Sequence, residues 1–162
     1  MKTKLLIVLA AVAMLFTACG KEKEAGKNTV TYDGVTYEVT PTVEVDDYDP
    51  NFAYLSALSG KVIFGVPMYN GVIQKTYDLS EEYPCEFDLF IGNNIEEDYD
   101  ILFIDYGCWS INGEDYERAF LSGSLETKLT DNTYSFVMDT KLGNGKNLAI
   151  NVEWTSDWFT NH

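Results

Sequence analysis

Histidine and arginine are almost missing from this 162-residue sequence. The single histidine is the last residue, His162, and the single arginine is Arg118. Ser-His-Asp and Cys-His catalytic arrangements need an imidazole held in fixed geometry, which a residue at the chain terminus does not provide. The same shortage excludes most zinc sites. We therefore expect a protein that is not an enzyme, with no metal and no cofactor.

Positive charge as a whole is scarce. Lys and Arg total 11 against 26 Asp and Glu, so the net charge is −15 and the isoelectric point lies near 4.2. Nucleic acid is excluded as a partner, because binding it requires cations that neutralise phosphates. The acidic residues gather in short runs between apolar segments, which is typical of solvated turns. Hydrophobic residues still make up 46% of the chain, the composition of one globular domain.

The first 19 residues have the pattern of a bacterial lipoprotein signal. Two lysines precede an apolar run at 5–16, which is too short to cross a bilayer core of about 30 Å. Small residues stand directly before Cys19. We expect residues 1–18 to be a signal peptide and Cys19 to carry lipid that anchors the protein in the outer membrane, on its periplasmic or cell-surface face. Residues 19–28 would be the anchor and a flexible tether. A plain secretory signal with an incidental cysteine is the alternative.

Alternation of apolar and polar residues dominates the rest of the chain and predicts an all-β domain over residues 29–160. The dipeptide Asp33-Gly34 is typical of a type I′ hairpin turn, and this turn would place Tyr32 opposite Val35. No stretch of the chain has a convincing helical stripe of three turns.

A second hairpin is predicted near the C-terminus. A turn at Asp131-Asn132 would place Leu129 opposite Tyr134, and a further turn at 143–145 would lead into a third strand. We expect this meander and the first hairpin to lie in one continuous sheet. Short strands at this spacing favour a single antiparallel β-barrel, with a β-sandwich as the alternative. Further strands are predicted at 52–58, 61–66, 72–78, 86–91, 101–106 and 119–122.

Both ends of this domain resemble a known kind of protein. The segments are VTYDGVTY at 30–37, placed shortly after the candidate lipidated cysteine, SGSLETKLTDNTYSFVMD at 122–139 and GNGKNLAINVEW at 143–154. They resemble small lipoproteins of Bacteroidetes that are described as lipocalin-like, or calycin-like, β-barrels. The resemblance is patchy between the two ends of the domain. It implies a fold and supplies no catalytic residue, because a shared fold does not fix function.

Aromatic residues are abundant, with 11 Tyr, 9 Phe and 3 Trp. Tyr106, Trp109 and Trp158 flank predicted loops, and rings in such places can stack on the apolar face of a sugar. We therefore predict binding of a small molecule or carbohydrate through these three residues. The alternative is a structural or protein-interaction lipoprotein of the outer envelope, expected if the barrel interior is filled. Most other aromatic residues are expected in the core, including Phe87, Phe90, Phe103 and Phe136.

Carboxylates offer two weaker interpretations. Asp88 and Asp105 fall within predicted strands, and two acids that converge in a cleft could hydrolyse a glycoside. Outward, solvated positions are the ordinary interpretation of such residues. The loop at 47–51 begins like an EF-hand calcium loop, but Phe52 stands where the sharp turn needs glycine.

The two cysteines outside the signal, Cys85 and Cys108, are a candidate disulfide, because an exported protein reaches an oxidising compartment. If a hairpin pairs Ile91 or Gly92 with Ile101, position 85 falls opposite 107 or 108, within reach of a bridge. Two free cysteines packed as small core residues are the alternative.

Overall fold

The computed structural model describes residues 28–81, 89–93, 102–105, 108–111, 114–115 and 118–161. These residues form an all-β fold of two antiparallel sheets, as the alternation in the sequence predicts. The strands of the first sheet are β1 (Thr29–Tyr32), β2 (Val35–Glu38), β6 (Thr76–Asp78), β11 (Phe120–Thr130), β12 (Thr133–Leu142) and β13 (Asn147–Thr155). Their spatial order is β2-β1-β13-β12-β11-β6, and we call this the six-stranded sheet.

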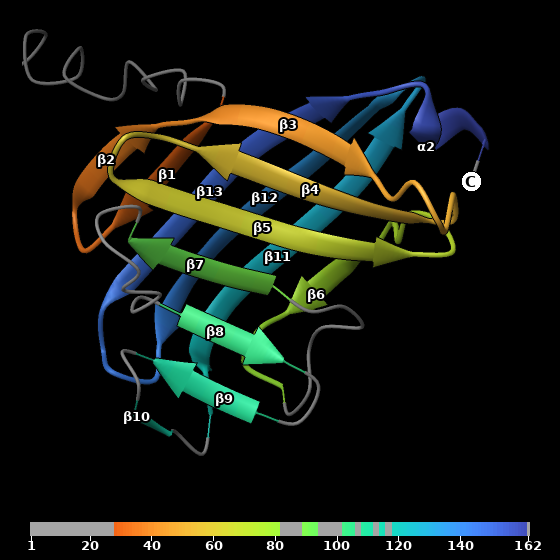
Figure 1. Ribbon diagram of the computed structural model, residues 1–162. Coiled ribbons are helices and arrows are strands. Elements are labelled where there is room, and N and C mark those ends of the chain that lie inside the picture. The colour runs from red at the N-terminus through yellow and green to blue at the C-terminus, as the bar shows by residue number, and fades with distance from the viewer. Residues whose placement is uncertain are drawn as a thin grey trace, which may run out of the picture.

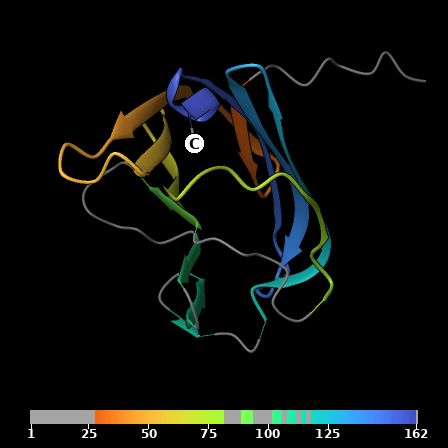
Figure 2. The same ribbon diagram turned by 90° about the vertical axis from the view of Figure 1, so that its right-hand side faces the viewer.

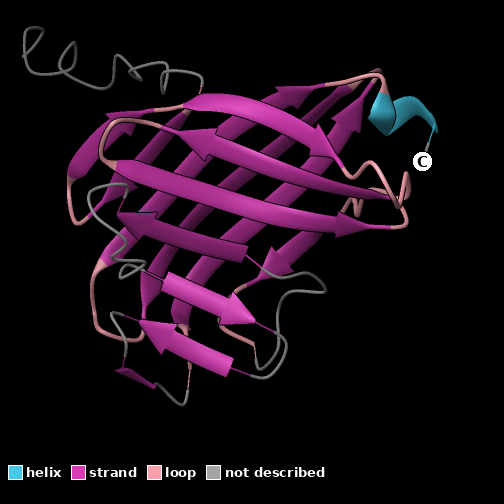
Figure 3. Ribbon diagram, viewed as in Figure 1, coloured by secondary structure: helices cyan, strands magenta, loops and turns pink. Residues whose placement is uncertain are grey.

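The second sheet is built from the strands between the two ends of the domain. They are β3 (Thr40–Val45), β4 (Phe52–Leu58), β5 (Val62–Tyr69), β7 (Leu89–Asn93), β8 (Leu102–Asp105), β9 (Cys108–Ile111) and β10 (Glu114–Asp115). This seven-stranded sheet has the spatial order β10-β9-β8-β7-β5-β4-β3. Figure 1 looks onto its outer side, with the strands of the six-stranded sheet crossing obliquely behind it. Figure 2 shows the two sheets as separate layers, and Figure 3 shows how strands dominate the chain.

The predicted hairpins are confirmed in the six-stranded sheet. Tyr32 pairs with Val35, and the backbone φ angles of Asp33 and Gly34 are 49° and 84°. Positive φ at both central residues is what a type I′ turn requires. The second hairpin pairs Leu129 with Tyr134, and β13 follows as the third strand of the meander. Strand β1 pairs with β13, so the two ends of the domain share one sheet as expected.

Strand β11 extends well beyond the short strand predicted at 119–122 and continues into the first strand of the second hairpin. The pairing with β12 shifts between Phe120 and Ser122, and Gly123 follows with a φ of 122°. A Cβ at Gly123 would overlap the backbone of Asp139 and Thr140 on the neighbouring strand. Glycine is therefore required at this bulge, which lets the long strand bend and continue.

The sheets meet at one corner. The chain leaves β2 and enters β3 through the single buried residue Val39, whose N–H donates to the carbonyl of Asn28 at 3.0 Å. Among the described residues, no backbone pairing closes the two sheets into one cylinder. The all-β prediction is thus confirmed, whereas a single closed sheet is not what the described strands form.

The inner faces of the sheets contact one another directly. The ring of Phe64 on β5 lies 5.1 Å from that of Phe136 and 5.8 Å from that of Trp154 on the opposite sheet, measured between centroids. The indole N–H of Trp154 donates to the backbone carbonyl of Ser56 at 2.6 Å, so a hydrogen bond also crosses the core. Large buried side chains therefore fill the interior at this level.

A short helix, α2 (Trp158–Asn161), covers one end of the core and buries both Trp158 and Phe159. The Phe159 ring lies 5.7 Å from the Tyr134 ring of β12. In Figure 1 this helix stands beside the end of β3 and the beginning of β4. Within the described part of the chain, no helix has the length and apolar character needed to cross a membrane.

Candidate functional site

The outer face of the six-stranded sheet is mostly polar, although the apolar side chains of Leu121 and Val137 are exposed on its strands. Hydroxyl pairs stabilise it across strands, with 2.9 Å between the side-chain oxygens of Thr31 and Thr36 and 3.0 Å for Thr133 and Thr155. Charged side chains such as Glu126 and Asp139 also point outward on this sheet. This is the alternation that an antiparallel sheet shows when one face packs on the core and the other meets water.

The outer face of the seven-stranded sheet is different, because it carries aromatic rings. Phe52 pairs with Tyr69 across β4 and β5, and their ring centroids lie 4.7 Å apart. The rings of Tyr54 and Phe90 are stacked, with centroids 5.6 Å apart and planes inclined by 15°. Tyr69 is 66% exposed, and the other three rings are half-buried. We call Phe52, Tyr54, Tyr69 and Phe90 the aromatic face.

Gly65 explains how two of these rings come together. It pairs with Phe90 on β7 and with Ser56 on β4, so its missing side chain would point to the same outer side as the rings. A Cβ at this position would overlap the Phe90 ring and the Tyr54 hydroxyl. Glycine weakens the interior of a strand, and it is found there when another group must approach the backbone closely. Here the approaching groups are the two stacked rings.

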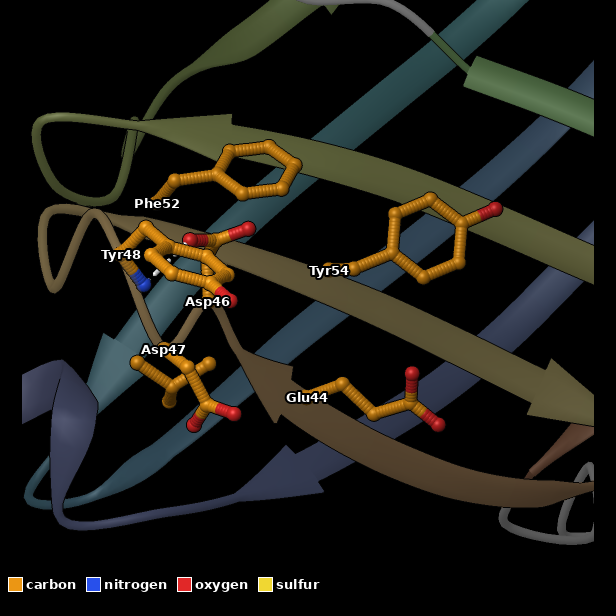
Figure 4. Close-up of a pocket in the computed structure, with 7 residues that line it drawn as sticks. Glu44, Asp46, Asp47, Tyr48, Phe52 and Tyr54 are labelled. Carbon is orange, nitrogen blue, oxygen red and sulfur yellow. Dashed lines mark hydrogen bonds between the residues drawn. The ribbon is translucent and has the colours of Figure 1, made fainter.

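An open hollow of about 290 Å³ lies at the end of the aromatic face, against the loop between β3 and β4. Three of the residues that line it are aromatic and three are acidic. Figure 4 shows the rings of Phe52 and Tyr54 side by side along β4, with their broad faces turned outward and Glu44 beside them on β3. The hollow is lined by Glu44, Val45, Asp46, Asp47, Tyr48, Phe52 and Tyr54.

Local hydrogen bonds fix the loop that walls this hollow. A carboxylate oxygen of Asp46 accepts the N–H groups of Tyr48 and Asp49 at 2.7 and 2.8 Å. The C-terminal helix adds a tie from outside the loop, because the indole N–H of Trp158 donates to the carbonyl of Pro50 at 2.8 Å. Such side-chain-to-backbone bonds give a turn a defined conformation. The wall of the hollow is therefore held in place before any ligand arrives.

The chemistry of the hollow is that of flat apolar rings beside hydrogen-bond acceptors. Ionised carboxylates accept hydrogen bonds from hydroxyl and ammonium groups, and ring faces attract cations and apolar C–H groups. None of the described residues that line the hollow is basic. Within the described residues, no three His, Cys, Asp or Glu side chains converge as metal ligands would. The arrangement is suited to binding an uncharged or cationic polar molecule.

Of the three residues predicted from the sequence as ligand-binding, the structure describes the side chain of Trp158 alone. Trp158 is only 6% exposed, and its indole belongs to the packed end of the core. Trp109 lies in β9, where the backbone alone is described, and Tyr106 lies outside the described residues. Of the two candidate acids, Asp105 ends β8, again with its backbone alone described, and Asp88 lies outside the described residues.

The predicted hairpin, which would place the two cysteines opposite each other, is present as β7 and β8. However, β8 ends at Asp105, before the pairing reaches position 108. Ile91 pairs with Leu102, which is the second of the two predicted registers. The chain then reverses after Asp105, and Cys108 pairs with Asp105 as the first residue of β9. Cys108 therefore lies on the side of β8 away from β7 and does not continue the ladder toward position 85. Cys85 itself lies outside the described residues, as does Cys19, so the bridge and the lipidation stay predictions.

The aromatic face is hard to find from the sequence, because aromatic residues at alternating positions are ordinarily assigned to the core. Phe136 is buried as predicted, but Phe90 lies on the outer side of its sheet. The signal available in the sequence is the run Phe52-Ala53-Tyr54, in which the small residue faces inward and the large ones outward. No family model, curated protein or solved structure matches the chain, so the site rests on its own geometry.

Proposed function

We propose that this chain is a non-catalytic, lipid-anchored protein of the outer envelope that binds carbohydrate on the aromatic face. The observation that carries the proposal is the contrast between the two sheets: the outer face of one is mostly polar, with Leu121 and Val137 exposed singly, and the other carries four clustered rings, of which Tyr69 is the most exposed. Exposed apolar clusters rimmed by polar residues mark interaction sites on soluble domains. The proposal moves the ligand from the predicted loop aromatics, Tyr106, Trp109 and Trp158, to the face of the sheet.

Carbohydrate suits this surface for two reasons. A pyranose has an apolar C–H face that stacks on a flat ring, and its hydroxyls need hydrogen-bond partners at the edge of that ring. The Phe52 and Tyr54 rings supply the first requirement, and the carboxylate of Glu44 beside Tyr54 supplies the second, with Asp47 elsewhere in the lining of the hollow (Figure 4). Because the rings of Phe52 and Tyr54 follow one another along β4, more than one unit of an extended chain can stack on them (Figure 4).

An external site also agrees with the packing of the core. Phe64, Phe136 and Trp154 occupy the interior between the sheets, where a lipocalin-like protein would hold its ligand. We propose that the two sheets form a β-sandwich with one continuous corner at Val39, rather than a closed lipocalin-like barrel. In this architecture the outer faces of the sheets are available for binding.

The second candidate function is a protein-interaction role in the outer envelope. The exposed Tyr69 favours it, because Tyr is enriched in the centres of protein interfaces. The two candidates differ in what the rings contact: separate sugar units in one case and a continuous apolar partner surface in the other.

Binding to soluble tetrasaccharides tests the proposal. We expect the purified chain to bind at least one among tetramers of glucose, N-acetylglucosamine, glucosamine, xylose and galacturonic acid, measured by calorimetry. The substitution Tyr69→Ala should weaken that binding about 5- to 30-fold, corresponding to about 1 to 2 kcal/mol for one exposed aromatic contact.

The matched control is Val137→Ala, which removes an exposed apolar side chain, 44% accessible, from the polar outer face of β12. It should leave the affinity unchanged. If no tetramer binds, or if both substitutions weaken binding equally, carbohydrate recognition by the aromatic face is wrong.

A further inference from the structure

If the proposed carbohydrate binding holds, the negative charge of the hollow indicates which class of sugar it binds. Glu44, Asp46 and Asp47 line the hollow together with three rings, and none of its described lining residues is basic. The carboxylate of Asp46 already accepts two backbone N–H groups of its own loop. Within the described residues, the carboxylates of Glu44 and Asp47 have no such hydrogen bond or ion pair. Two anionic groups of the lining therefore remain to meet a ligand, Glu44 beside the Tyr54 ring and Asp47 on the loop (Figure 4).

This combination discriminates between ligands by charge. A sugar with a carboxylate or sulfate would bring a third negative charge against these two acids, and like charges within a few ångströms repel. A protonated amine is attracted twice, by the carboxylates and by the negative faces of the aromatic rings. A neutral sugar gains the stacking and the hydroxyl hydrogen bonds but neither electrostatic attraction.

The net charge of the whole chain also favours a cationic ligand over an anionic one. Without Lys2 and Lys4 of the predicted signal peptide, the net charge falls to −17, which keeps anionic polymers away from the surface in general. The nearest basic residue in sequence on this sheet, Lys61, lies in the turn between β4 and β5, at the opposite end of β4 from the hollow. Among the described residues, no basic side chain lines the hollow to offset its acids.

We propose that the hollow at the end of the aromatic face binds the protonated amine of an amino sugar. A saccharide chain of glucosamine-type units would lay its pyranose faces on Phe52 and Tyr54 and direct an ammonium group toward Glu44 beside Tyr54, with Asp47 adding negative charge from the loop (Figure 4). The rings provide affinity for sugar in general, and the two carboxylates select the amine.

The test compares three tetrasaccharides that share the pyranose ring and differ in charge: glucosamine, N-acetylglucosamine and galacturonic acid. At low salt we expect the glucosamine tetramer to bind about tenfold more tightly than its N-acetylated counterpart, and the galacturonic acid tetramer not to bind. The preference for the amine should shrink as salt is raised, because exposed charges are screened. Equal binding of the first two would overturn the amine site while leaving carbohydrate binding intact.

Variants separate the site from the overall charge of the protein. Glu44→Gln combined with Asp47→Asn should abolish the preference for glucosamine while retaining binding of the N-acetylated tetramer. The matched control is Glu126→Gln combined with Asp139→Asn, which removes the same charge from the exposed outer face of the six-stranded sheet. An equal loss in both double variants would overturn the proposal, because overall charge alone would then account for the preference.

A binding measurement with a cationic peptide distinguishes recognition of an amino sugar from attraction of any polycation. Tetralysine carries a similar charge but has no pyranose face to stack on the rings. We expect it to bind at least about tenfold more weakly than the glucosamine tetramer. If tetralysine binds as tightly and competes for the same site, recognition of an amino sugar is wrong. If none of these three tetrasaccharides binds while the glucose or xylose tetramer does, the amine site is wrong and the proposed function stands; if none of the five tetramers binds, the proposed function itself fails.

Discussion

The substitution Gly65→Ala is expected to disturb ligand binding on the aromatic face far more than it lowers the stability of the fold. The added methyl group would stand where the Phe90 ring and the Tyr54 hydroxyl now lie, so the two stacked rings must move apart. Both side chains are half-buried on an outer face and can swing into solvent. The core side of β5, where Phe64 and Val66 are buried, is not touched.

The expected magnitudes can be estimated from these contacts. Loss of the ring pair costs about 0.5 to 1.5 kcal/mol, and alanine in place of glycine returns about 0.5 to 1 kcal/mol of conformational free energy. The free energy of unfolding should therefore fall by less than about 1 kcal/mol if the rings swing freely. If they are confined, overpacking raises the cost to about 2 kcal/mol. Ligand binding should suffer more, because the flat surface is disrupted.

Thermal unfolding and tetrasaccharide binding measured on the same sample check this separation. We expect a melting temperature within a few degrees of the parent, altered tyrosine circular dichroism in the near ultraviolet, and at least about tenfold weaker binding. Gly60→Ala is the control, because nothing lies within 4 Å of a Cβ built there. Unchanged binding by Gly65→Ala would refute the assignment of the ligand to these rings.

Three further substitutions probe the core, the loop and the anchor. Trp154→Phe leaves the carbonyl of Ser56 without its donor across the core and should lower the unfolding free energy by about 2 to 3 kcal/mol, read from urea titration; a cost below about 0.5 kcal/mol would contradict the described packing. Trp158→Phe removes the bond to Pro50 and should speed amide exchange in the loop at 46–51 while core amides keep their protection; unaltered exchange there would count against the tie. Cys19→Ala should move the protein from the membrane pellet to the soluble fraction, and a variant that stays in the pellet would exclude the lipid anchor.

Local patterns in the sequence predict the six-stranded sheet well. The turns at Asp33-Gly34 and Asp131-Asn132 fix register directly, because a two-residue loop leaves one way to pair the flanking strands. Along β13 the buried residues alternate with partly exposed ones, so the inward face can be assigned before the structure is known. Where one face of a sheet meets water and the other packs on the core, the alternation of polar and apolar residues is sufficient to assign the inward face.

The inward face of the seven-stranded sheet cannot be assigned from alternation in the same way, because both of its faces carry apolar residues in places. Along β4, rings point outward while small or aliphatic residues such as Ala53 point inward, which reverses the usual assignment. Strand β3 is absent from the predicted strands, since Pro41 and exposed polar residues interrupt its pattern; proline is tolerated there because β3 is an edge strand. The candidate site lies on these strands, so the sequence alone does not locate it.

The most direct measurement is nuclear magnetic resonance of aromatic ring protons during titration with the glucose, N-acetylglucosamine and glucosamine tetramers. We expect the signals of Phe52, Tyr54 and Tyr69 to shift with the bound fraction, while those of the buried Tyr134 and Phe136 stay in place. Shifts confined to the buried rings would place a ligand between the sheets. That result, or the absence of any shift on the aromatic face with all three tetramers, would contradict the central claim.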